Sequence, residues 1–201
     1  TPCGTLFPYT TLFRSLRCAF DVARPLTESV YQKAQGNPFF STQFLKSLHE
    51  DGLIYFNAET NYWQCDLAKV KEVAAGDDVV EFMASRISKL GSKTQKVLKL
   101  AACIGNQFDL ATLAIVKQDS LADTAGDLWQ ALEEGLILPT SKIYNFFADV
   151  GEFTLEEESF NLDLSYKFLH DRVQQAAYSL IPESDKQKTH LKIGELLLKN
   201  I

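Results

Sequence analysis

The stretch Ser92-Lys-Thr-Gln-Lys-Val-Leu-Lys-Leu-Ala-Ala-Cys-Ile-Gly105 has a clear helical period. Ser92 and Gln95 match a capping box at its start, and Gly105 is typical of a helix end. Its apolar residues recur at i, i+3, i+4 and i+7, the spacing of an amphipathic helix: Val97, Leu100, Ala101 and Ile104. The stretch therefore predicts a helix that buries one face.

The residues that follow predict two more helices and a pair of strands. Asp109 can cap a short helix through Val116. A further helix covers about residues 123–134 with Leu128, Ala131 and Leu132 inward. Residues 136–138 and 166–169 are typical of buried strands, and a long acidic stretch separates them. Three helices followed by a two-stranded wing is the order of a winged helix, which residues 92–169 supply.

Helices flank this region on both sides. Residues 79–90 repeat the amphipathic spacing, and residues 171–181 give a helical face that Pro182 ends. A last helix begins near Glu183, with Ile193, Leu196 and Leu197 on one side.

The N-terminal part predicts two helices separated by Gly36-Asn37-Pro38. Glycine is typical of a helix end, asparagine of an N-cap and proline of a first helical turn. The first helix covers residues 27–35 with Tyr31 and Ala34 inward, and the second runs to about Glu50. Residues 53–56 and 62–66 then predict a hairpin, and residues 73–76 a linker.

The expected fold class is therefore mainly α, with a helical unit and β-hairpin over residues 16–75 and a winged-helix domain over 76–181. Residues 182–201 add a further helix. Residues 1–15 fit neither period and resemble a translated sequencing-adapter tract, so we expect an artefactual tail there. The alternative is a β-prone tail that packs on the rest of the chain. Because the chain starts at Thr1 and its one methionine is Met83, we expect a fragment of a longer protein.

Composition favours a folded, cytoplasmic chain. The hydrophobic fraction is 46%, enough to bury a core, and the formal net charge is −6. The four cysteines form no C-x-x-C pair and no zinc-like spacing with histidine, so we expect reduced thiols and no metal. No apolar run approaches the ~18 residues that span a bilayer, so we expect no membrane partner.

The candidate chemical groups are few. The chain has no G-x-x-x-x-G-K-[ST] phosphate loop and no motif around a nucleophile, so we expect no catalytic residue and no enzyme activity in this chain alone. His170 stands where a strand meets the helix 171–181, with Asp171 able to cap that helix and Arg172 adding a cation. It can lie beside an anion at a helix start, or be a partly buried histidine in a strand–helix joint.

Two charge patterns bear on nucleic-acid binding. A basic stretch is most simply a solvated face, with a nucleic-acid patch as the alternative: Arg86, Lys89, Lys93, Lys96 and Lys99. Residues 123–134 carry four acidic residues and no basic one in the position where a winged helix reads DNA, and they would repel phosphates. We therefore expect no nucleic-acid partner.

Three stretches resemble the STAND-type AAA+ ATPase module of large bacterial sensor kinases, which join serine/threonine kinase, ATPase, helical-repeat, GAF and sensor histidine kinase parts. The resemblance covers about residues 16–201, without the phosphate-loop portion of the module. The stretches are Gln32-Lys-Ala-Gln-Gly36-Asn-Pro-Phe-Phe40 with Gln43-Phe-Leu45, Leu98-Lys-Leu-Ala-Ala-Cys-Ile-Gly105-Asn-Gln-Phe-Asp109, and Phe168-Leu-His-Asp-Arg-Val-Gln-Gln-Ala-Ala-Tyr178.

The resemblance implies roles for particular residues. Residues 16–75 would be the lid of the ATPase, with Gly36-Asn37-Pro38 matching a lid motif whose proline packs on adenine. Leu169-His170-Asp171 is similar to a methionine–histidine–aspartate motif that contacts the nucleotide β-phosphate, with leucine in place of methionine. Pro38 and His170 are the implied nucleotide contacts, and Asn37 and Arg172 are weaker candidates.

The implied mechanism is a signalling switch. ADP or ATP, bound only in the intact parent, would link an upstream P-loop core to Pro38 and His170, and exchange would alter helical repeats downstream of residue 182 and the kinase domains. The alternatives are a DNA-binding winged helix and a protein adaptor with no nucleotide role. Both partners in the switch, the upstream core and the downstream repeats, would belong to the same parent chain.

Overall fold

The computed structural model describes residues 20–76, 78–140 and 164–199. The expected tail at residues 1–15 and most of the acidic stretch lie outside these residues. The chain divides after Val79 into an N-terminal unit and a C-terminal unit, each compact in itself. The described residues are mainly helical with small antiparallel sheets, which confirms the mainly α fold class.

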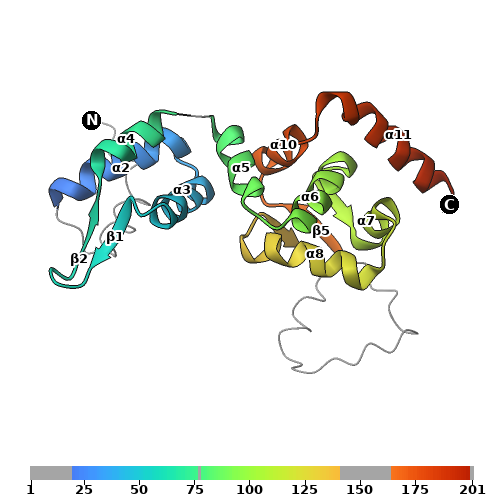
Figure 1. Cartoon of the computed structure of the whole chain (residues 1–201), viewed down its shortest axis with the longest axis horizontal. Helices are drawn as coiled ribbons and strands as arrows, with labels where there is room; N and C mark the ends of the chain where they lie inside the picture. The colour runs from blue at the N-terminus through green and yellow to red at the C-terminus, as the bar shows by residue number, and fades with distance from the viewer. Residues whose placement is uncertain (1–19, 77, 141–163, 200–201) are drawn as a thin grey trace, which may run out of the picture. The chain divides into compact units, whose positions relative to one another are not determined.

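The described part of the N-terminal unit consists of three helices and a hairpin. It runs α2 (Phe20–Ala34), α3 (Pro38–Glu50), β1 (Ile54–Asn57), β2 (Tyr62–Cys65) and α4 (Leu67–Ala75). α2 packs against both α3 and α4, and β1 pairs antiparallel with β2 (Figure 1). Its fully buried side chains are Val30, Phe44, Leu48 and Val70, each worth about 1.5–3 kcal/mol on burial.

The inward face of α2 differs from the predicted one. Tyr31 is 49% exposed, so its expected inward position is wrong, whereas Ala34 is buried as predicted. The helix also begins earlier than residue 27 and includes Pro25. Its buried side runs through Leu26, Val30 and Ala34 at i, i+4 and i+8, which turns Tyr31 a quarter-turn outward.

The expected linker at residues 73–76 is instead the end of helix α4. Asp66 caps the start of α4 by accepting the backbone N–H of Lys69. At the other end, the buried Lys33 ammonium donates to the carbonyls of Gly76 at 3.0 Å and Val73 at 3.5 Å. A cation placed on the last carbonyls of a helix stabilises it through the helix dipole.

The C-terminal unit has the element order of a winged helix. After α5 (Val79–Ser88) it runs α6 (Ser92–Ile104), β3 (Gln107–Asp109), α7 (Leu110–Lys117), α8 (Leu121–Glu133), β4 (Ile137–Pro139) and β5 (Ser165–Phe168). The sheet order is β3-β5-β4, antiparallel throughout. Two helices follow, α10 (Asp171–Ser179) and α11 (Glu183–Lys199), and both pack against α6 (Figure 1).

The core of this unit forms around α6. This helix packs against α7, α8 and α10, and its Val97, Leu98 and Ala101 are fully buried. The facing helices contribute further fully buried side chains: Leu113, Leu128, Ala131, Val173 and Ala176. Leu128 and Ala131 are buried as predicted. On α6 the predicted face is only partly right, because Leu100 and Ile104 are half-buried and Leu98 is fully buried in their place.

Several local predictions in this unit differ from the structure. Strand β3 is an addition to the predicted two-stranded wing. The capping box at α6 is wrong, because Gly91 is the N-cap and Gln95 instead donates to the carbonyls of Ser88 and Leu90. Asp109 precedes α7 as expected, but its carboxylate accepts the Ser165 hydroxyl at 2.7 Å rather than a helix N–H.

Arg86 does not belong to a solvated basic face. It is only 7% exposed and its guanidinium donates to the Glu134 carboxylate at 3.0 Å, joining α5 to the end of α8. Lys89, Lys93 and Lys96 are exposed, as a solvated face requires.

Candidate functional site

The first predicted site lies at the start of α3. Gln35 and Gly36 both have positive φ, 50° and 83°, and turn the chain sharply out of α2. Asn37 follows in extended conformation, and its Oδ1 accepts the N–H groups of Phe39 at 2.9 Å and Phe40 at 3.4 Å. Asn37 is therefore the N-cap that the sequence predicts, and its side-chain oxygen serves the helix.

Pro38 is the first residue of α3 and is exposed. Its ring lacks an N–H, so it can offer a ligand only apolar contact. The helix behind it is anchored by Phe40 and Phe44, both buried. The start of α3 thus presents a fixed apolar ring that could pack against a planar group.

The second predicted site lies at the start of α10, and its geometry changes the assigned roles. His170, and not Asp171, is the N-cap of the helix. Its Nδ1 accepts the backbone N–H of Arg172 at 3.2 Å, while Asp171 lies inside the first turn as an exposed carboxylate. An acidic residue there is favourable for the helix dipole but does not make the cap.

The cap fixes which nitrogen of His170 bears the proton. A neutral imidazole that accepts a hydrogen bond at Nδ1 carries its proton at Nε2. The half-buried His170 ring can therefore donate an N–H at the start of a helix, where backbone dipoles attract anions. Arg172 is exposed beside it, and its guanidinium donates to the Gln175 amide oxygen at 3.1 Å.

The joint that holds His170 is well tied. The backbone N–H of Leu169 donates to the carbonyl of Leu136, and that of Phe168 donates to Asn106. The Gln174 amide donates to the Ala102 carbonyl at 3.2 Å, which attaches α10 to α6. These bonds hold His170 in extended conformation at the end of the sheet.

The two sites belong to different units. Pro38 and Asn37 lie in the N-terminal unit, and His170 and Arg172 lie in the C-terminal unit. That all of them border one nucleotide stays a prediction.

Other reactive groups in the described part of the chain do not form a site. Burial raises the pKa of the Cys103 thiol, an effect that the nearby Lys186 ammonium partly offsets, so its thiolate is disfavoured. No group of three or more histidine, cysteine, aspartate or glutamate side chains in residues 20–76, 78–140 and 164–199 could hold a metal ion. No described helix is long and apolar enough to cross a bilayer.

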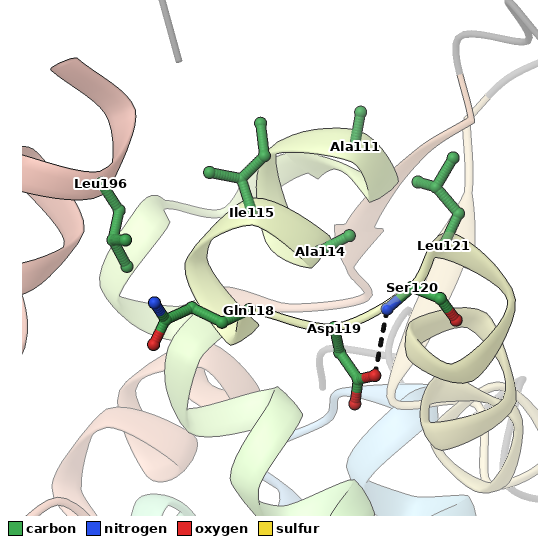
Figure 2. A pocket seen from close by; sticks show the side chains of 8 residues that line it. All are labelled: Ala111, Ala114, Ile115, Gln118, Asp119, Ser120, Leu121 and Leu196. Atoms are coloured by element: carbon green, nitrogen blue, oxygen red, sulfur yellow. Dashed lines mark hydrogen bonds between the residues drawn. The ribbon is translucent and has the colours of Figure 1, made fainter. Parts of the chain in front are cut away.

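A hollow of about 710 Å³ lies between α7, the start of α8 and Leu196 of α11 (Figure 2). Its walls are largely apolar, including Ile115 and Leu121, and its charged group is the Asp119 carboxylate, which accepts the Ser120 N–H. That carboxylate is paired with the Lys117 ammonium at 2.9 Å, so the hollow offers a phosphate no unpaired cation among its lining residues. None of the predicted nucleotide contacts lines this hollow, so it is not the predicted site.

Comparison with known proteins finds two signalling kinases. The chain is 34% identical to the hybrid signal transduction histidine kinase G of Dictyostelium discoideum, over 87% of this chain and 6% of that protein. It is 24% identical to the peroxide stress-activated histidine kinase mak3 of Schizosaccharomyces pombe, over 85% of this chain and 7% of that protein. The chain is similar to a small segment of signalling histidine kinases.

No family model and no solved structure matches the chain. The two relatives support the expected link to signal transduction and histidine kinases. Both are eukaryotic, so they do not support the expected restriction to bacterial proteins. The ATPase module and the serine/threonine kinase part stay predictions.

Proposed function

We propose that this chain is a regulatory segment of a signalling histidine kinase, with no catalytic group of its own. In this proposal the N-terminal unit is the lid and the C-terminal unit the winged helix of a switch that closes on ADP or ATP. A P-loop core elsewhere in the parent holds the nucleotide, and α11 leads into helical repeats. The chain spans about 6–7% of the length of the curated relatives it matches, so the parent's activity is part of the proposal.

One observation carries the nucleotide part of the proposal: the cap at the start of α10. Accepting the Arg172 N–H at Nδ1 directs the His170 proton to Nε2. A phosphate oxygen at this helix start would receive that N–H and the favourable end of the helix dipole. The Asp171 carboxylate opposes such an anion, and the exposed Arg172 guanidinium offsets it.

Pro38 gives the lid a matching role. An exposed proline ring on a capped, anchored helix supplies apolar contact to a flat base without requiring a donor. Adenine binding by this ring and phosphate binding by His170 would together recognise both ends of one nucleotide. ADP could then hold the lid and winged helix closed only as far as it binds the closed state more tightly than the open one.

The test uses the intact parent kinase and compares His170→Asn with His170→Ala. Asparagine retains an N-cap oxygen but lacks the imidazole N–H, so it separates phosphate binding from helix capping. We expect His170→Asn to weaken ADP binding about tenfold, because a hydrogen bond to a charged group is lost. Calorimetric titration of ADP measures this directly.

His190→Asn is the matched control for His170→Asn, since His190 is exposed on α11 and bonds Tyr178 rather than a helix start.

Pro38→Ala tests the lid, and we expect it to weaken ADP binding several-fold while leaving the Asn37 cap in place. ADP affinity that is unchanged in both His170→Asn and Pro38→Ala would exclude the nucleotide role and leave the chain as an adaptor.

The DNA-binding alternative lacks basic side chains on the helix that would read DNA. Helix α8 occupies the position that reads DNA in a winged helix, and it contains Asp123, Asp127 and Glu133 but no lysine or arginine. Binding to a phosphate backbone depends on basic side chains.

A further inference from the structure

The surface of α8 that faces away from the core has an unusual composition. Ala122, Gly126, Trp129 and Glu133 recur at i, i+4, i+7 and i+11, and all four are exposed. Thr124, Leu128 and Ala131 on the opposite side are buried. We call the four exposed residues the α8 outer face. Its Trp129 is 55% exposed, a large apolar area for a helix whose packing needs are already met.

Trp129 is held in one orientation. Its indole Nε1 donates to the Glu133 carboxylate at 2.8 Å, one helical turn further along. This bond removes rotamer freedom before any partner arrives, which lowers the entropy lost on binding. It also places a negative charge at the edge of an exposed aromatic ring.

Gly126 is not required by the fold. It lies in the interior of α8, where glycine destabilises a helix relative to alanine. The backbone φ of Gly126 is not positive, so its conformation does not require glycine. A Cβ atom added to Gly126 would have no other atom within 4 Å apart from its own neighbours along the helix. A glycine that neither the backbone nor the packing demands leaves a shallow, open area beside Trp129, where another chain can approach closely.

The charge of the helix selects the kind of partner. Of its carboxylates, Asp127 is paired with the Lys117 ammonium at 2.7 Å and is mostly buried. Asp123 and Glu133 are exposed, and no residue of α8 is basic. The outer face is therefore negative and aromatic, which repels a phosphate backbone and attracts a cation.

We propose that the α8 outer face is a docking surface for an arginine-bearing segment of a partner protein. A guanidinium is planar, stacks on an indole ring and can bond a carboxylate through two N–H groups at once. Trp129 and Glu133 offer the ring and the carboxylate side by side, and Ala122 and Gly126 make room for the backbone that carries the arginine. This inference is independent of nucleotide binding by the parent.

The test titrates the full chain with a short blocked peptide carrying arginines one helical turn apart. The indole N–H signal of Trp129, assigned by Trp129→Phe, reports binding in a nitrogen–proton NMR spectrum. We expect this signal to shift with the arginine peptide at concentrations up to about 1 mM. A peptide with glutamate in place of arginine should not shift it.

Variants then separate docking from folding. We expect Trp129→Ala to weaken peptide binding at least about tenfold, and Glu133→Gln several-fold, because each removes one half of the guanidinium contact. Gly126→Gln should weaken binding and yet raise the melting temperature, since glutamine is a better helix former. Gly194→Gln is the matched control: Gly194 is also helical and exposed, with nothing within 4 Å of an added Cβ. It should raise the melting temperature without changing peptide affinity.

Five results would overturn the proposal, and the first four come from the peptide titrations and from the chain alone. These are no shift of the Trp129 signal at the highest arginine-peptide concentration, an equal shift with the glutamate peptide, equal affinities for Gly126→Gln and Gly194→Gln, or a Trp129 shift that grows with protein concentration alone. The last would assign the face to a second copy of the chain. A shift of the Trp129 signal on adding a DNA duplex without the peptide would be the fifth such result, in favour of a nucleic acid.

Discussion

The smallest feature with a consequence for the whole proposal is one hydrogen bond, from the Arg172 backbone N–H to His170 Nδ1. It makes His170 part of helix α10 as well as a candidate ligand group. We expect His170→Ala to lower the free energy of unfolding by about 1 kcal/mol, the usual value of a lost N-cap. His170→Asn should recover most of that loss, because asparagine caps helices well. Urea denaturation of the chain followed by circular dichroism measures both values.

Asp171→Asn controls for the neighbouring charge at the same helix start. Asp171→Asn should lower the free energy of unfolding by less than His170→Ala does, because Asp171 contributes only through the helix dipole. If Asp171→Asn lowers the free energy of unfolding more than His170→Ala does, then Asp171 caps the helix in solution and the tautomer assigned to His170 is wrong.

The sequence predicts the start of α3 better than the start of α10. The role of Asn37 is local chemistry, because a glycine before it and a proline after it define one helix start. At α10 the sequence offers His170 and Asp171, and aspartate is ordinarily the better cap. The choice depends on where the sheet ends: the Leu169 N–H still bonds the Leu136 carbonyl, which fixes His170 as the last extended residue. That contact is not visible in the sequence.

Helices α7 and α8 are joined by an ion cluster around a single lysine. The Lys117 side chain is 6% exposed and its ammonium contacts Asp119 at 2.9 Å and Asp127 at 2.7 Å. Burial lowers the Lys117 pKa, but the hydrogen bonds to Asp119 and Asp127 outweigh it, so the pKa lies above 10.5. The hydrogen bond from Lys117 lowers the pKa of Asp119 below 3.8.

We expect Lys117→Met to lower the free energy of unfolding by about 2 kcal/mol at neutral pH, because it leaves the mostly buried Asp127 carboxylate without its cation. The raised lysine pKa means that the contribution is complete below pH 10.5 and is lost as the pH rises through the folded value. The lowered pKa of Asp119 means that its part is complete above pH 3.8 and is lost as the pH falls through the folded value. Urea denaturation across this range measures the difference from the unmodified chain.

Two variants make the Lys117 measurement specific. Lys117→Met with Asp127→Asn should be more stable than Lys117→Met alone, because no charge is then left unpaired inside. Lys96→Met, on the exposed face of α6, should change stability by less than about 0.5 kcal/mol. A loss for Lys117→Met that is the same at every pH would show that its packing, and not its charge, joins the two helices.

The helices and strands that the sequence did not predict are those held by residues far away in the chain. Helix α4 has only the residues Leu67–Ala75, too few to be stable alone, and it is held by packing on α2 and by the Lys33 ammonium. Strand β3 has three residues and exists because β5 pairs with it. Longer helices such as α3, α6 and α8 were predictable because their apolar period is itself the reason that they pack.

The charge of the whole molecule tests the remaining alternative, a DNA-binding winged helix. The formal net charge is −6, and the helix in the reading position is acidic, so association with a polyanion is opposed both over the whole molecule and at α8. Non-specific DNA binding strengthens steeply as salt is lowered, because it depends on release of counterions from neutralised phosphates. We therefore expect no mobility shift of a DNA duplex at about 50 mM salt, even with the chain at micromolar concentration.

Replacing Asp123 and Glu133 with lysine should create weak binding, which shows that the assay detects a winged helix once its outer helix is basic. A shift with the unmodified chain that disappears as salt is raised would show instead that basic side chains elsewhere, such as Lys93 and Lys96 on α6, bind phosphates.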